Sequence, residues 1–208
     1  MKKKFYGFRK WEQPYGGTIV FVMSAFFLFG AILGSFISTA VLKEGGGMLY
    51  EKLTGYLLRY AGEYLRPTFF SSFISNFRLP LLIFIFSLTG YGVFLIPVSL
   101  MLRGLMLSAV VTGFIRLYGI NGAFLSLAAF GIQNVLAIPA LIILSTQAYS
   151  FAGVHYDKIR SVGRRALEAL PAEEYLKLCG VLSVVLFFCV FTELFISPVL
   201  ITYIHNFL

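Results

Sequence analysis

The run TIVFVMSAFFLFGAILGSFISTAVL, residues 18 to 42, decides the fold of this 208-residue chain. It contains no charged residue, and at about 1.5 Å per residue a helix of this length crosses a hydrocarbon core about 30 Å thick. The overall composition agrees, because 59% of the residues are hydrophobic, 12% are charged and the mean hydropathy is +0.86. A water-exposed surface cannot absorb so many apolar side chains. The sequence therefore predicts an all-α, polytopic membrane bundle.

Four further apolar segments bring the predicted number of transmembrane helices to about five. The predicted spans are 18–42, 79–98, 104–117, 122–151 and 178–203. A tight turn containing Arg103 is expected between the second and third spans. Residues 1–17 form a predicted basic N-terminal segment, and residues 18–208 a single transmembrane domain with a cytoplasmic linker at 152–177.

Basic residues predict the orientation of the chain. Five precede the first span, and five more lie in the linker: Lys158, Arg160, Arg164, Arg165 and Lys177. Positively charged segments stay in the cytoplasm, so the N-terminus is predicted to be cytoplasmic and the C-terminus extracytoplasmic. The first apolar run is too long for a signal peptide and lacks its cleavage site, so we expect it to remain as an anchor. We expect the net charge of +8 to set the orientation of the chain in the membrane and to attract anionic lipid, and we expect no nucleic-acid partner.

Residues 43–78 form a predicted extracytoplasmic amphipathic segment. Apolar residues recur every three or four positions from Leu49 to Tyr64, whereas Arg59, Glu63 and Arg66 share the other side. Two interpretations remain open: a helix that rests on the outer leaflet, and a docking surface for an extracytoplasmic partner. Pro67 is expected to end this helix, and an aromatic belt at headgroup depth is expected at Phe69, Phe70, Phe73 and Phe77.

Small residues at four-residue spacing mark two predicted packing faces. One comprises Gly30, Gly34 and Ser38 in the first span, and the other comprises Gly104 and Ser108 in the third. Such spacing lets a neighbouring helix backbone approach closely. The face in the first span is typical either of a homodimer interface or of ordinary packing within one membrane bundle.

Polar residues inside two spans are the candidate functional residues. The stretch 122–151 is long enough to overshoot a bilayer, so Pro139 is expected to kink it or to break it into two half-helices. Gln133 and Asn134 precede this proline, and Glu193 lies in the last span before a second kink at Pro198. Asn134 and Glu193 are expected at similar depth. We therefore predict a hydrogen-bonded cluster of Gln133, Asn134 and Glu193, acting as a structural clasp or as a proton or solute site.

The inventory of reactive residues argues against an enzyme. No motif of paired acids, no zinc-binding spacing and no phosphate-binding loop is present, so we expect no catalytic residue, metal or cofactor. Cys179 and Cys189 face different sides of one helix and are not expected to pair. The stretch Thr89-Gly90-Tyr91-Gly92 is similar to a potassium-channel filter but lacks its valine, and it is expected inside a continuous apolar run.

The chain resembles the stage II sporulation protein M family over nearly its whole length. The resemblance rests on Arg103 and Gly104 before a small-residue helix, on GINGAFLSLAAFGIQNVLAIPALII at 119–143, and on Glu193 five residues before Pro198. One position departs from the family pattern, because Ile132 stands where family members commonly have proline.

The resemblance implies a non-enzymatic role in endospore formation. Family members anchor and localise a membrane complex with two peptidoglycan-cutting partners, the stage II sporulation proteins D and P, which drives engulfment of the forespore. The alternative from another class is a small transporter or permease-type subunit that uses the Asn134 and Glu193 cluster, because transporters place ionisable groups beside broken helices. Five spans do not divide into two equal repeats, but dimerisation through the first span could supply the missing half.

Overall fold

The computed structural model describes residues 16–43, 69–160 and 172–197, with the isolated positions 51, 55 and 199. The regular structure of these residues is entirely helical: α1 (Gly16–Lys43), α3 (Phe69–Ser87), α4 (Gly92–Ser126), the π-helical turn η2 (Leu127–Gly131), α5 (Ile132–Arg160), α6 (Ala172–Phe191) and the π-helical turn η3 (Thr192–Ile196). The prediction of an all-α membrane bundle is confirmed. Arg59, Glu63, Arg66 and Pro198 lie outside the described residues.

Four segments are long and apolar enough to cross a membrane, which makes this a multi-pass membrane protein. They are Gly17–Val41, Gly92–Gly131, Gln133–Gly153 and Tyr175–Ile196, and a shorter apolar helix covers Ser72–Ser87. The 40-residue segment is interrupted at Gly119, whose φ of 60° and ψ of −136° suit glycine and strain other residues. The chain reverses there, and Gly122 packs against the backbone of Phe114.

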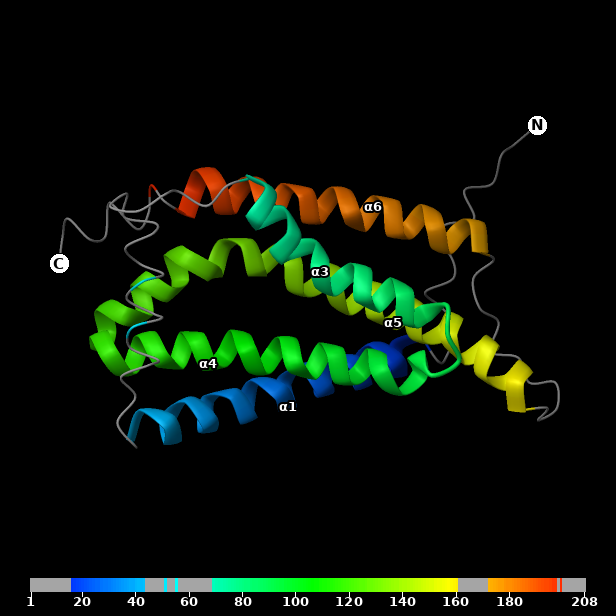
Figure 1. Cartoon of the computed structure of the whole chain (residues 1–208), viewed down its shortest axis with the longest axis horizontal. Helices are drawn as coiled ribbons and strands as arrows, with labels where there is room; N and C mark the ends of the chain where they lie inside the picture. Colours follow the sequence, from blue (N-terminus) through cyan, green and yellow to red (C-terminus); the bar gives the residue numbers. More distant parts are fainter. Residues whose placement is uncertain are drawn as a thin grey trace.

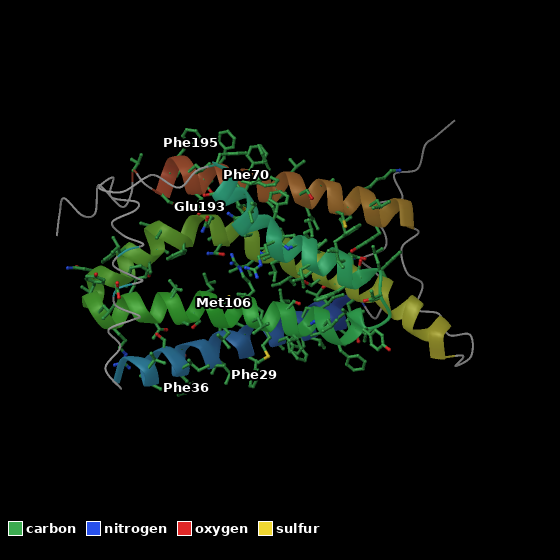
Figure 2. The ribbon with its side chains drawn as sticks, in the orientation of Figure 1. Phe29, Phe36, Phe70, Met106, Glu193 and Phe195 are labelled. Carbon is green, nitrogen blue, oxygen red and sulfur yellow. The ribbon has the colours of Figure 1, made fainter. Side chains whose placement is uncertain are left out.

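The helices lie side by side with α1 and α6 on opposite edges of the bundle (Figure 1). α1 packs chiefly against α4, whereas α3 and α5 lie between α4 and α6. The main core joins these helices through buried apolar side chains, among them Met23, Ile83, Ile96, Leu100 and Leu144. Large apolar side chains also cover the outside, as expected for lipid contact: Phe29 and Phe36 project from α1 and Phe195 from the α6 side (Figure 2).

The predicted turn at Arg103 is wrong, because Arg103 lies inside α4. The chain turns instead at residues 88–91, where the backbone N–H groups of Thr89 and Gly92 donate to Phe86 and Thr89. A Cβ at Gly92 would collide with the backbone of Phe86, so glycine fits this turn. The predicted continuous span 79–98 is therefore wrong, because it is divided between α3 and α4 by this turn.

Other helix boundaries also differ from the predicted ones. α3 begins at Phe69, so the last ten residues of the predicted outer segment belong to a helix that continues into the bundle. α5 passes through Pro139 and continues to Arg160, which makes it one long helix rather than two half-helices. α6 begins at Ala172, six residues before the predicted start of the last span. By contrast, α1 differs from the predicted span 18–42 by two residues or fewer at either end.

The small residues of α1 pack against α4 of the same chain. Gly30 and Gly34 lie directly against the backbones of Met101 and Leu105, and Gly104 lies against the backbone of Phe27. A Cβ on any of these three glycines would overlap a backbone carbonyl oxygen of the other helix. α4 therefore occupies the face that the sequence also offered as a homodimer interface, with Ser38 buried and Ser108 half-buried on α4.

Candidate functional site

Glu193 is the centre of a polar cluster inside the bundle. It lies in η3 at the end of α6, and only 8% of its surface is exposed. Asn76 Nδ2 donates a hydrogen bond of 2.6 Å to Glu193 Oε2, and Ser72 Oγ donates one of 3.4 Å to Glu193 Oε1. Ser72 and Asn76 are four residues apart and therefore share one face of α3. In Figure 2 Glu193 lies toward the interior, whereas Phe195 lies on the outer edge. The carboxyl group thus ties α6 to α3.

Arg103 provides a cation on the opposite side of this cluster. It lies between Met101 and Leu105, which touch the glycines in the middle of α1, so it sits deep within the spanning part of α4. Its Nη2 donates a hydrogen bond of 3.3 Å to Asn134 Oδ1, and its charge attracts that of Glu193. A lipid-facing arginine at the centre of a helix costs about 2.5–3.5 kcal/mol on insertion scales, and these partners offset that cost.

The π-helical turns lie directly beside the polar residues. Asn134 Nδ2 donates a hydrogen bond of 2.7 Å to the carbonyl oxygen of Phe130 in η2. Ser197 Oγ donates one of 3.4 Å to the carbonyl oxygen of Ala129, also in η2. An extra residue in a helical turn leaves backbone carbonyls without their usual partners, so side chains can bind them. Asn134 of α5 and Ser197, which directly follows η3, are therefore anchored to the same stretch of backbone.

Two buried atoms of the cluster have no hydrogen-bond partner among the residues that the structure describes. They are Arg103 Nε and Gln133 Oε1, and Gln133 is only 7% exposed. Such atoms are costly in an apolar interior. The cluster is therefore not fully satisfied by the side chains around it.

A family model identifies the relatives of this bundle. The model for stage II sporulation protein M matches residues 23–198, which is most of the chain. The chain belongs to this family. The match includes the polar cluster residues Ser72, Asn76, Arg103, Asn134 and Glu193. Searches of the curated proteins and of the solved structures gave no significant match.

In this family member the three residues of the predicted cluster do not all bond to one another. Gln133, Asn134 and Glu193 are all buried, but Asn134 bonds to Arg103, whereas Glu193 bonds to α3. The backbone carbonyl oxygens that accept hydrogen bonds from Ser197 and Asn134 are those of Ala129 and Phe130 in η2. Sequence reasoning missed Arg103 because it assigned the charge to a turn, and missed Ser72 and Asn76 because it assigned them to the outer segment. The four-residue spacing of these two polar residues on an apolar helix was the available signal.

A separate interhelical hydrogen bond lies at the other end of α3. The hydroxyl group of Tyr175 donates a hydrogen bond of 2.8 Å to Ser87 Oγ. The Tyr175 ring stacks on Phe84 and Phe151, with ring-centroid distances of 6.0 and 4.9 Å. The two ends of α3 are thus attached to the two ends of α6. This pairing fixes the depth of α3 relative to its neighbour.

The described residues do not include a group of three histidine, cysteine or acidic side chains placed to hold a metal ion. The cluster instead consists of one carboxyl group, one guanidinium, three amides and two hydroxyl groups. Such groups can bind each other across helices, or bind small polar solutes and protons. Both alternatives of the sequence analysis, a clasp and a solute site, therefore have a structural basis.

Proposed function

We propose that this chain is a non-enzymatic membrane scaffold that anchors and localises a peptidoglycan-remodelling complex during engulfment of the forespore. The match to the stage II sporulation protein M family over residues 23–198 carries this proposal. The partners are the stage II sporulation proteins D and P, as the family resemblance implies. The four membrane-crossing segments support an anchoring role, because they would hold such a complex in the cell membrane.

In this proposal the polar cluster acts as an interhelical clasp. Asn76 and Glu193 join α3 to α6, and Arg103 and Asn134 join α4 to α5. Lipid tails are as apolar as leucine, so hydrophobic burial cannot choose between helix arrangements in a bilayer. Hydrogen bonds and charge pairs can make that choice. A scaffold needs one fixed arrangement in order to present the same surface to its partners.

The proposed orientation places the basic N-terminus in the cytoplasm and the C-terminus outside. The segment 43–78 then begins on the extracytoplasmic side, where the hydrolases act. Its charged residues Arg59, Glu63 and Arg66 are the proposed contacts. Charge reversal at Arg59 and Arg66 should weaken the partnership, and unchanged co-purification of the double variant would remove this surface from the proposal.

The experiment that tests the scaffold role is affinity purification of the tagged full chain, in mild detergent, from starved host cells. We expect peptidoglycan hydrolases to be enriched at least severalfold over a tagged, unrelated multi-pass protein of similar abundance. Equal recovery with both baits in engulfing cells would contradict the proposal. Loss of engulfment in the deletion strain, restored by the wild-type chain, is the matching cellular result.

A small transporter is the second candidate, and two observations favour it. Arg103 Nε and Gln133 Oε1 are buried and find no hydrogen-bond partner in the described part of the chain, and η2 and η3 interrupt regular helix geometry beside the charged groups. Transporters use such interruptions at their binding sites. Glu193→Gln separates the candidates, because glutamine keeps hydrogen bonding but cannot release a proton. A scaffold should keep its partners in this variant, whereas a proton-coupled carrier should stay folded and lose transport.

A further inference from the structure

The lipid-facing side of α3 carries an apolar groove with one charged residue in it. The groove has a volume of about 340 Å³, and its apolar walls are Phe73, Ile74, Phe77, Leu81, Leu82 and Ile85. These positions recur every three or four residues, so they form one continuous helix face. Ile74, Leu81 and Ile85 are about half exposed, at 49%, 57% and 49%. Arg78 also lines the groove, is exposed, and has no hydrogen-bond or ion-pair partner among the residues that the structure describes.

The depth of Arg78 follows from the attachment of α3 to α6. Ser87 bonds to Tyr175, the first residue of the apolar segment Tyr175–Ile196, so Ser87 lies near one edge of the hydrocarbon core. Arg78 precedes Ser87 by nine residues, which is about 14 Å along a helix. Half of a hydrocarbon core is about 15 Å. Arg78 therefore lies close to the middle of the bilayer and faces lipid.

A cation at this depth calls for an anion at the same depth. Lipid phosphates lie at the membrane surface, further away than an arginine side chain extends from the bilayer centre. The carboxylate of an acidic residue in a neighbouring transmembrane helix can lie at the centre. A second copy of this chain does not offer one, because Glu193 is the single acidic residue in the described spanning segments. It is buried against Ser72 and Asn76.

We propose that the groove on α3 binds a transmembrane helix of another protein, and that Arg78 pairs with an acidic side chain near the middle of that helix. The apolar walls on both sides of Arg78 along the helix would contact leucine-like side chains above and below the acid. For the biological identity of this partner the inference rests on the proposed scaffold function. The chemistry of the partner follows from the groove itself.

The test uses a synthetic helix as the partner. The full chain is reconstituted into phosphatidylcholine vesicles with a labelled 21-residue polyleucine helix that carries one central glutamate, and energy transfer reports association. Polar contacts between membrane helices are worth about 1–2 kcal/mol in model peptides, which is roughly a five- to thirty-fold change in association. We expect that loss when the central glutamate is replaced by leucine, and also in Arg78→Leu. Arg78→Lys should retain most of the association.

Matched controls keep the result specific. Arg116 is a second exposed arginine, located on α4 outside the groove, so Arg116→Leu should not change association. Arg78→Glu should bind a polyleucine helix with a central lysine, and helicity should confirm that each variant is folded. Equal association of the glutamate and leucine helices would overturn the inference, as would full displacement by added phosphatidylglycerol, which would identify a lipid site. Failure of this test with hydrolases still co-purifying would leave the scaffold function standing.

Discussion

Arg103 and Arg78 are two arginines in membrane-embedded helices with opposite surroundings. Arg103 belongs to α4, donates a hydrogen bond to Asn134 of α5, and its charge attracts that of Glu193. Arg78 lies on the lipid side of α3, in an apolar groove and without a partner among the described residues. Both carry the same charge at a depth where charge is costly. Within the fold, Asn134 and Glu193 offset the free-energy cost of burying Arg103, whereas in our proposal a binding partner offsets the cost of Arg78.

This comparison predicts separate consequences for stability and for binding. Replacement of an interior group leaves a partner unpaired in a dry environment, so folding is affected. Replacement of the lipid-facing arginine removes a cost from the isolated protein, so folding is preserved and binding is lost. Substitutions on the interior side, and at the contacts that hold the two arginines in place, separate the two effects.

Arg103→Leu is expected to have the largest effect. It leaves the Glu193 carboxyl group without its countercharge and Asn134 Oδ1 without a donor, so the free energy of unfolding should fall by about 3–5 kcal/mol. Denaturation in mixed micelles, followed by helicity, measures it. Arg78→Leu is the matched control and should leave stability unchanged or slightly raised. Equal losses in both variants would remove the distinction between the two arginines.

Gly34→Val should be the next most damaging change. The backbone of Leu105 lies directly against Gly34, so the added side chain must separate α1 from α4 on one side of Arg103. Overpacking of this kind costs about 3 kcal/mol at the upper end of its usual range. Gly180→Ala is the control, because no described residue lies within 4 Å of a Cβ at that position, and alanine favours a helix. Retained stability in Gly34→Val would mean that the close contact of α1 does not hold Arg103 at its depth.

Asn76→Ala tests the inward face of α3. Asn76 and Arg78 are two residues apart, which turns them about 200° around the helix, and Asn76 donates to Glu193 at 2.6 Å. Loss of a hydrogen bond to a carboxylate should lower the free energy of unfolding by about 2 kcal/mol. The exposed Ser183, which bonds to the Cys179 carbonyl within α6, supplies the control Ser183→Ala. The same small change in both thermal midpoints would argue against a clasp at Glu193.

Tyr175→Phe should have the smallest effect. The ring contacts with Phe84 and Phe151 remain, but the hydrogen bond to Ser87 is lost, which should cost about 1 kcal/mol. This bond fixes the end of α3 that sets the depth of Arg78. Tyr91→Phe is a suitable control because Tyr91 is 75% exposed. A thermal midpoint of Tyr175→Phe that matches wild type would show that stacking alone attaches α3 to α6.

Local composition was enough to predict an all-α, multi-pass membrane protein and the bounds of α1, although not those of the other helices. Each residue of α1 adds its own transfer free energy, so a sum along residues 18–42 identifies the span without knowledge of its neighbours. The burial of Asn134 and Glu193 was also predictable, because a polar side chain in an apolar run must turn away from lipid. The small-residue spacing of Gly30 and Gly34 likewise predicted a close helix contact, although not which helix would make it.

Only the tertiary structure decided where each charge belongs. Hydropathy alone predicts a turn at Arg103, because the charge interrupts an apolar run. Inside α4 the charge is stabilised by Asn134 and Glu193, which are 31 and 90 positions away in the sequence. The partners of Glu193 were similarly hidden, because Ser72 and Asn76 reach it from α3 across a separation of 121 and 117 residues. A charge interacts with whatever lies nearby in space, and that set of neighbours is created by packing. The sequence therefore determined which segments enter the membrane, and packing determined which polar groups meet there.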